Sequence, residues 1–379
     1  MYISSIKNQA SSILAHQRGA KKGMFARPKS PYSPPAHADR ILIIHQGAIG
    51  DFILSLPAIG SFRHNYSDAS IEIWGHLDIL ELVEKRFYAD TISSINRREM
   101  AQCYNENAVL DVKLVEQFKQ FDLIVIFGQR QEILLHNLKK HEIKEVYCVN
   151  TFPQGKESTH IIEYQLSQIL RLGFKVSERV PKLFPSESDR KRASDLFTQN
   201  KVSDKTLRVA MHVGSGSRKK SWLPGSFAQL SEQLIKDDHT TIIVPIGPAD
   251  EKMVREYFAL IRSDAIIPFN NISLNKLAAV LHKCDLYVGN DSGITHLAAA
   301  VGIPVVALFG PTDPRVWGPR GDKVFTVYKG LECSPCSREE MRRCVYQGCM
   351  EKIPVEEIYR RIKETTKITK GTEGKKINP

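Results

Sequence analysis

Short apolar runs alternate along the chain with longer stretches in which apolar residues recur at helical spacing. The first runs, rich in Ile, Leu and Val, lie at 41–45, 71–74, 123–127 and 146–149. Runs of this length are typical of strands that are buried on both faces. The segments at 52–65 and 77–87 have the spacing of amphipathic helices. This alternation predicts βαβ units, and therefore a parallel sheet with helices on both faces.

The alternation stops between residues 180 and 206, which are rich in Ser, Lys and Asp, and then resumes. The second set of predicted strands lies at 208–212, 241–245, 285–288, 304–309 and 324–328. The predicted helices between them lie at 224–236, 249–261, 274–282 and 294–301. The pause predicts a junction near 190–206 between two α/β domains that face each other across a central cleft. Ligands of such sheets bind beyond the carboxyl ends of the strands.

The predicted organisation has four parts. We expect a basic leader over 1–40, a first domain over 41–190 and a second domain over 206–350. A C-terminal part follows over 351–379, with a helix predicted at 354–367 and a loose tail at 370–379.

The charge of the chain narrows the range of partners. The 379 residues carry a formal net charge of +11, which favours phosphates, an acidic membrane surface or nucleic acid. No apolar run approaches the roughly 20 residues of a membrane span, and the N-terminus lacks the apolar block of a secretory signal. No nucleic-acid-binding motif occurs, so nucleic acid is disfavoured. We therefore expect a cytoplasmic protein.

The leader is strongly basic. Its 40 residues contain seven Lys and Arg residues and one acid, Asp39. Three interpretations remain open: a disordered tail, a short amphipathic segment that attaches the protein to an anionic membrane, or an organellar targeting peptide.

The turn after the first predicted strand contains Gly47, Gly50 and Asp51. The two glycines allow a tight turn and the close approach of another molecule. Asp51 has two interpretations: it caps the helix that begins here, or it lies in the cleft as a general base. The dinucleotide-binding spacing of glycines is absent.

Two further turns suit a diphosphate. Ser215 lies in a Gly/Ser-rich loop that continues into three cations, of which Lys220 is the last. Backbone N–H groups and a Lys of this kind can hold phosphate oxygens, although a flexible surface loop has the same composition.

The second of these turns comes after the strand at 285–288, where Asp291, Ser292 and Gly293 begin a helix of small residues with His296 one turn along. A helix N-terminus attracts anions, and the alternatives are a helix cap for Asp291 and a buried structural role for His296. Another turn, at 247–251, contains Glu251, an acid that would bind ribose hydroxyls or cap a helix.

These segments together resemble glycosyltransferase family 9, the ADP-heptose:lipopolysaccharide heptosyltransferases, over about residues 40–350. The residues that carry the resemblance are Gly50 with Asp51, the 212–215 segment with Lys220 and Trp222, and the blocks 290–300 and 302–312. The resemblance implies a GT-B fold, an α/β architecture of two facing, doubly wound Rossmann-like domains. The N-terminal domain would bind the acceptor and the C-terminal domain the nucleotide sugar.

The resemblance also implies a reaction: inverting transfer of a heptose from ADP-heptose to the lipopolysaccharide inner core, a lipid-linked phosphorylated saccharide. Asp51 would be the general base, beside an acceptor loop containing Gly47 and Gly50. The implied donor contacts are Ser215, Lys220, Glu251, Asp291, Ser292, Gly293 and His296. Helix N–H groups and a Lys would hold the departing diphosphate, so no cofactor is expected for catalysis.

The setting implied is peripheral, on the inner face of the bacterial inner membrane. Basic residues for the acceptor phosphates follow no motif; the candidates are Arg63, Arg97, Arg98 and Arg130. The alternatives of the same fold are a sugar-nucleotide 2-epimerase, a transferase of another sugar, and a nucleotide-sugar-binding relative without turnover.

Four cysteines lie close together near the end of the second domain: Cys333, Cys336, Cys344 and Cys349. Their pairwise spacing is that of a structural zinc site. Free thiols packed in the core are the second interpretation, and disulfides or an iron–sulfur site the third. Four thiolates would leave no open coordination position, so a metal here would be structural rather than catalytic.

Overall fold

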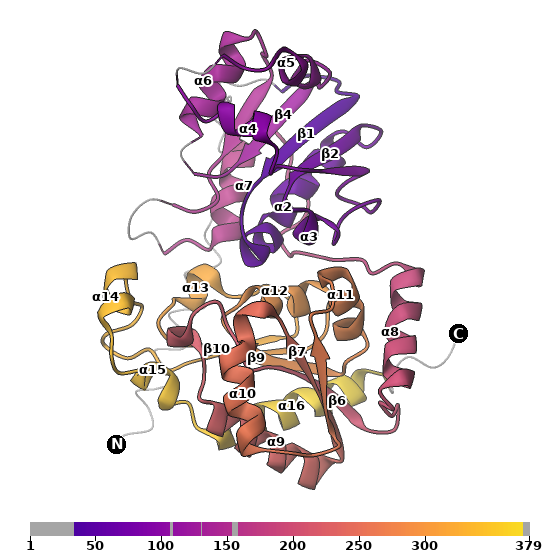
Figure 1. The fold of residues 1–379 in the computed structure, drawn as a ribbon, viewed down its shortest axis with the longest axis vertical. Helices are drawn as coiled ribbons and strands as arrows, with labels where there is room; N and C mark the ends of the chain where they lie inside the picture. The colour runs from indigo at the N-terminus through magenta and orange to yellow at the C-terminus, as the bar shows by residue number, and fades with distance from the viewer. Residues whose placement is uncertain (1–33, 107–108, 130, 154–157, 374–379) are drawn as a thin grey trace, which may run out of the picture.

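The computed structural model describes residues 34–373, except 107–108, 130 and 154–157. It consists of two domains, which lie one above the other in Figure 1. Each domain contains one parallel sheet with helices on both faces. Most of the predicted basic leader, residues 1–33, lies outside the described residues. Among the described helices, none is long and apolar enough to cross a membrane.

The first sheet has five parallel strands in the order β3-β2-β1-β4-β5. Their bounds are β1 (Arg40–His45), β2 (Ser70–Gly75), β3 (Thr91–Ser94), β4 (Leu123–Phe127) and β5 (Val146–Val149). The residues of β1 from Ile41 onward are fully buried because helices cover both faces. Helices α2 (Ile49–Asn65) and α7 (Ile161–Arg171) pack on one face, and α5 (Val112–Phe118) and α6 (Glu132–Lys140) on the other.

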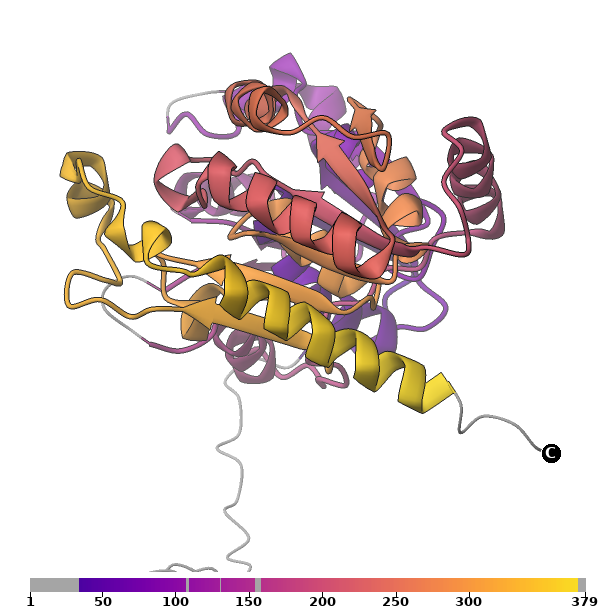
Figure 2. The same ribbon diagram turned by 90° about the horizontal axis from the view of Figure 1, so that it is seen from below.

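The second sheet has six parallel strands in the order β11-β10-β9-β6-β7-β8. Their bounds are β6 (Leu207–His212), β7 (Thr240–Ile246), β8 (Ile266–Asn270), β9 (Leu286–Asn290), β10 (Val305–Phe309) and β11 (Val324–Tyr328). Helices α9 (Pro224–Asp238), α10 (Glu251–Leu260) and α16 (Val355–Glu373) cover one face, and Figure 2 shows α16 beside α9. Helices α11 (Leu274–His282) and α12 (Gly293–Ala300) cover the other face, toward the first domain.

Three predictions about the elements were wrong. The helix predicted at 77–87 ends early, as α3 (Leu77–Leu80), because the chain then turns repeatedly and Lys85 has a positive φ of 52°. The predicted junction contains a helix, α8 (Glu187–Gln199), which a capping box between Ser186 and Asp189 begins. The C-terminal helix α16 continues to Glu373, into the predicted tail.

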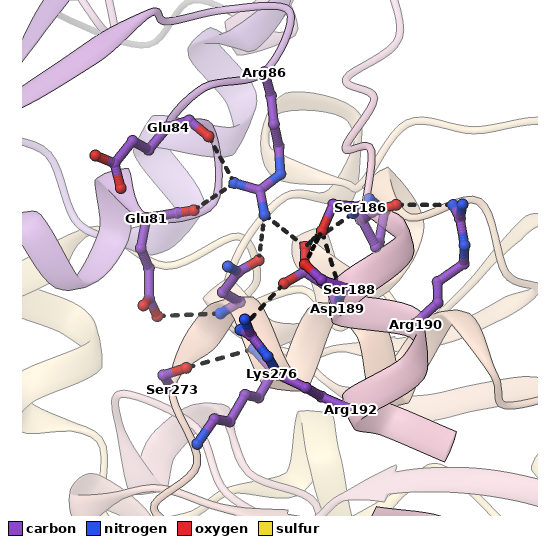
Figure 3. A network of polar contacts seen from close by, with 12 residues as sticks. Glu81, Glu84, Arg86, Ser186, Ser188, Asp189, Arg190, Arg192, Ser273 and Lys276 are labelled. Atoms are coloured by element: carbon purple, nitrogen blue, oxygen red, sulfur yellow. Dashed lines mark hydrogen bonds and ion pairs between the residues drawn. The ribbon is translucent and has the colours of Figure 1, made fainter. Parts of the chain in front are cut away.

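A polar network joins the two domains beside α8 (Figure 3). Arg86, in the loop after α3, donates to the Asp189 carboxylate over 2.6 Å and to the Asn275 side chain over 3.0 Å. Asn275, in α11, in turn donates its backbone N–H to Glu81 over 3.1 Å. The Arg86 and Asp189 side chains are only 13% and 3% exposed. The network therefore fixes how α3 of the first domain lies against α8 and α11.

The strand order of each sheet indicates at which point along its edge a ligand would bind. The order reverses between β1 and β4 in the first sheet and between β6 and β9 in the second. Ligands bind at such reversals, outside the carboxyl ends of the strands. The loops after β1, β6 and β9 are therefore the place to look for a site.

Candidate functional site

Asp51 lies in the first turn of α2, directly after the loop that follows β1. Its carboxylate accepts a hydrogen bond from the backbone of Ala48, so the predicted capping role is real. Burial nevertheless raises the pKa of Asp51, and the Ala48 bond with the charges of Lys220 and Arg338 offsets only part of this rise. Asp51 is thus both a cap and a partly desolvated carboxylate that faces two cations of the other domain.

A buried histidine supports this turn. His45, the last residue of β1, accepts the Gly47 N–H at Nδ1 over 3.1 Å. Its Nε2 therefore carries the hydrogen and donates to Ser55 Oγ over 3.1 Å, and Ser55 donates to the Asp51 carbonyl over 2.8 Å. Burial lowers the pKa of His45 to about 3, so the ring stays neutral. A Cβ at Gly47 would lie 2.6 Å from the His45 ring and 2.8 Å from Asp51 Cβ, which explains the glycine.

The loop after β6 is held by a buried amide. Asn290, at the end of β9, accepts the Trp222 N–H over 2.8 Å and donates to the carbonyls of Val213 and Gly214 over 3.2 and 3.0 Å. Ser215 is buried, and its hydroxyl bonds within the loop to Ser217 and Ser221. The Gly/Ser-rich loop is therefore pinned to the neighbouring strand, with its cations at the carboxyl edge of the sheet.

An ion pair places one cation of this loop beside α12. Lys220 Nζ lies 2.8 Å from Asp291 Oδ2, and Thr312 donates to the same oxygen over 2.6 Å. Asp291 is buried, whereas Lys220 is partly exposed. Because Lys220 also lowers the pKa of Asp51, the structure brings the predicted base and the predicted phosphate-binding cation together across the two domains.

The N-termini of α2 and α12 meet at two glycines. A Cβ at Gly293 would lie 2.8 Å from Ile49 Cβ and 3.1 Å from the Gly50 nitrogen. A Cβ at Gly50 would lie 3.3 Å from the ring of His296. Burial lowers the pKa of His296 to about 4, so this ring packs neutral against the opposite domain. Ser292 caps α12 by accepting the Thr295 N–H.

We predict that Gly293→Ala impairs activity without unfolding the protein. The added methyl has no room against Ile49, so the two helix ends move apart and the predicted base, Asp51, is displaced from the predicted donor site. A misplacement of this kind lowers kcat/KM by roughly 10- to 100-fold. Steady-state rates of ADP release measure the effect. Gly225→Ala in α9 is the matched control, because its Cβ position meets only the end of the Leu260 side chain, at 4.0 Å; equal rates for the two variants would contradict the prediction.

A second buried histidine joins three loops of the second domain. His212 Nε2 lies 3.1 Å from Asp250 Oδ2, and its Nδ1 lies 3.4 Å from Ser292 Oγ. Burial raises the pKa of Asp250, but the bonds from His212 and the Gly247 N–H outweigh it and hold that pKa below its usual value. Glu251, the acid predicted from the sequence, follows directly and is exposed at the start of α10. Glu251 therefore has access to a ligand, while Asp250 supports the turn.

The four clustered cysteines are free thiols. Burial raises the pKa of Cys336, and the other three cysteines raise it further, so the four lie near one another. Two of the thiols are turned to backbone carbonyls, Cys336 to Cys333 and Cys344 to Tyr346. Within the described part of the chain, no three His, Cys, Asp or Glu residues are arranged to hold a metal. As they are placed here, the thiols do not converge on a point where a zinc ion would bind. Zinc binding by the four cysteines stays a prediction.

The predicted acceptor cations lie in different settings. Arg63 is held by Asp90 and the carbonyl of Ala69, and Arg97 stacks 4.5 Å over the Trp74 ring. Both therefore stabilise the first domain. Arg98 is exposed in α4 (Arg98–Gln102), which follows β3, and Arg130 lies outside the described residues.

A cavity of about 770 Å³ lies at the opposite edge of the second sheet, where β6, β9 and β10 begin. Its lining includes Arg208, which is already paired with Asp204 and Asp285. The candidate site remains at the carboxyl edge, where Asp51, Lys220 and the N-terminus of α12 converge.

The comparisons with known proteins identify the family and the fold. A model of glycosyltransferase family 9 (heptosyltransferase) matches residues 153–346. Lipooligosaccharide heptosyltransferase 2 of Campylobacter jejuni is 23% identical over 84% of this chain and 96% of its own.

Two solved structures share the fold. The family 9 glycosyltransferase of Veillonella parvula superposes with a TM-score of 0.70, at 17% identity over 87% of this chain and 98% of that one. The ADP-heptose lipopolysaccharide heptosyltransferase II of Escherichia coli superposes with a TM-score of 0.69, at 16% identity over 87% and 99%. The predicted GT-B architecture is thereby confirmed.

Proposed function

Because the chain belongs to glycosyltransferase family 9, the heptosyltransferases, we propose that it transfers a heptose from ADP-heptose to the inner core of lipopolysaccharide. The names of its relatives support this donor and this acceptor. The observation that carries the proposal is the meeting of Asp51 with Lys220 and the N-terminus of α12, from opposite domains, at the two points where strand order reverses. We place the enzyme at the cytoplasmic face of the bacterial inner membrane, where such an acceptor is anchored.

Asp51 acts in this mechanism as the general base. Its carboxylate takes the proton of the acceptor hydroxyl as that oxygen attacks the anomeric carbon of the heptose. The new glycosidic bond forms on the face opposite the breaking bond, so the configuration inverts. The bond between the anomeric carbon and the diphosphate oxygen breaks, and ADP leaves with the electron pair.

The second domain stabilises the charge that develops on ADP. Lys220 and the free N–H groups at Gly293 lie together at the carboxyl edge, where they meet the diphosphate oxygens. Asp291 and Ser292 hold these groups in place, and Ser215 orders the adjoining loop. Glu251 is exposed on the neighbouring turn and is available to the ribose hydroxyls. These charges serve the leaving group without a metal ion.

Nucleotide binding and product analysis test the proposal. We expect calorimetric titration to show tighter binding of ADP than of GDP or UDP, and Lys220→Ala to weaken ADP binding about tenfold through loss of a charged hydrogen bond. Lys252→Ala, an exposed lysine of α10, is the control. Incubation with ADP-heptose and heptose-free inner core should give ADP and a glycosylated acceptor. A preference for UDP, or a product epimerised at C2, would contradict the proposal and favour the 2-epimerase.

The acid limb of the pH profile tests the role of Asp51. A general base works only when deprotonated, so kcat/KM falls as the pH drops through the raised pKa of Asp51. We expect this fall above the ordinary value of 3.8. Lys220→Met removes a charge that lowers this pKa, so the fall moves to higher pH, while Lys252→Met leaves it in place. A limb that moves to lower pH in Lys220→Met, measured at saturating donor, would contradict the assignment.

A further inference from the structure

Helix α14 (Arg338–Arg343) lies in the cysteine-containing segment and is fastened at both ends. Before it, the Cys336 N–H donates to the Pro311 carbonyl over 2.7 Å. After it, the Cys344 carbonyl accepts a hydrogen bond from the Lys219 ammonium. A capping box between Ser337 and Glu340 begins the helix. The helix is therefore a fixed projection of the second domain.

Both anchors adjoin the proposed diphosphate site. Pro311 precedes Thr312, which bonds to Asp291, and Lys219 precedes Lys220, the partner of the same Asp291. Figure 1 shows α14 at the rim of the second domain, on the side that faces the first. The helix thus stands beside the place where donor and acceptor must meet.

The side chains of α14 divide into a paired and an unpaired set. Arg343 forms an ion pair with Glu339 one turn earlier. Arg338 and Arg342 are also one turn apart and share a face, yet no ion pair among the described residues includes either of them. Both are exposed. Arg338 moreover lies close enough to Asp51 in the first domain to act on its carboxylate.

We propose that Arg338 and Arg342 form an anion subsite that binds a phosphate or carboxylate group of the acceptor saccharide and so places the reacting hydroxyl at Asp51. The proposal rests on the proposed function. Two guanidinium groups on one helix face suit a group with two or three oxygens, because each can donate a pair of hydrogen bonds. Of the predicted acceptor cations in the first domain, Arg63 is held by Asp90 and Arg97 by Trp74, whereas Arg98 is exposed.

The residues that follow α14 suggest a different role for the two arginines, which is binding to a membrane surface. Val345 and Tyr346 are 96% and 61% exposed, and such residues beside arginines also suit a membrane surface. The acceptor is favoured because α14 faces the first domain beside the proposed diphosphate site, and because Arg338 is near enough to lower the pKa of the Asp51 carboxyl. A water-soluble acceptor separates the two roles, because it binds without a membrane.

The test uses steady-state kinetics of the full chain with heptose-free inner core from which the acyl chains have been removed. We expect Arg338→Gln and Arg342→Gln each to raise the KM for this acceptor at least about tenfold, the loss of a charged hydrogen bond. The KM for ADP-heptose stays unchanged, as does the Kd for ADP. Arg343→Gln, on the same helix but paired with Glu339, is the control and keeps the wild-type KM.

Modified acceptors identify the group that is bound. If the subsite binds phosphate, phosphatase-treated acceptor abolishes the difference between wild type and Arg338→Gln. If it binds a carboxylate, reduction of the acceptor carboxyl groups abolishes that difference instead. A difference that survives both treatments would overturn the proposal, because no anionic group of the acceptor would then be recognised.

Three other results would overturn the subsite. An increase in the KM for ADP-heptose would assign the arginines to the donor. Wild-type kinetics in both variants, with weaker binding to vesicles containing anionic lipid, would assign them to the membrane. An equal effect of Arg343→Gln would show only a general effect of charge. If wild type binds ADP-heptose but transfers nothing to the intact acceptor, the proposed function itself fails, and the subsite fails with it.

Discussion

Replacing Asp51 with Asn lowers kcat by about 1,000-fold, within the range that a general base contributes. The amide keeps an oxygen that can accept the Ala48 N–H, so the cap of α2 survives while the proton acceptor is lost. The rate of ADP release with saturating donor and acceptor measures the loss. Calorimetry should show ADP binding no weaker than in wild type, because the substitution removes a negative charge near Lys220 and no donor contact.

Two features make the Asp51 experiment decisive. The thermal unfolding midpoint of Asp51→Asn should match that of wild type, which separates catalysis from folding. Asp51→Ala, which loses both the base and the cap, should be equally inactive and also less stable by about 1 kcal/mol. A fall in kcat of less than tenfold in Asp51→Asn would rule out this residue as the base.

Arg86→Met has the largest expected effect on stability. It leaves the Asp189 carboxylate buried without its main partner, and breaking a buried pair in this way costs about 3–5 kcal/mol. The low exposure of both side chains, 13% and 3%, justifies this range. Urea unfolding measures the change, read as a lower midpoint.

The control for Arg86 is an exposed ion pair. Lys182 and Glu178 lie 3.0 Å apart with both side chains nearly half exposed, so Lys182→Met should cost under about 1 kcal/mol. The double variant Arg86→Met with Asp189→Asn should recover much of the loss, because the uncompensated charge is gone. If Arg86→Met unfolds within 1 kcal/mol of wild type, the network in Figure 3 does not fix the domains.

The sequence predicts most of the fold because most strands are buried on both faces. The run at β4 coincides with the predicted segment, since apolar residues fill it from end to end. Strand β3, with the sequence TISS, escapes prediction because it is a short, half-buried edge strand. Strand β8 contains Pro268, which argues against a central strand but is tolerated at the edge where β8 lies.

Some residues of the candidate site can be predicted from the sequence and others cannot. Asp51, Lys220, Asp291 and Gly293 can be predicted because each lies where a strand gives way to a helix, a position visible in the sequence. Two features cannot be predicted: the support that His45 gives to the turn before Asp51, and the pairing of His212 with Asp250. The role of a buried polar residue depends on a partner that only the fold supplies. For His212 and Asp250 that partner is 38 positions away. The feature that His45 and His212 share in the sequence is that each ends an apolar strand.

The abutting glycines of α2 and α12 have a thermodynamic consequence. Each helix N-terminus carries about half a positive elementary charge, so the contact between Gly50 and Gly293 brings two like partial charges together. An anion at this point relieves their repulsion, and by linkage the arrangement that brings the two ends together binds the anion more tightly. Anion binding and the contact between the two helix N-termini should therefore strengthen each other, and added salt should weaken this coupling because it screens the partial charges.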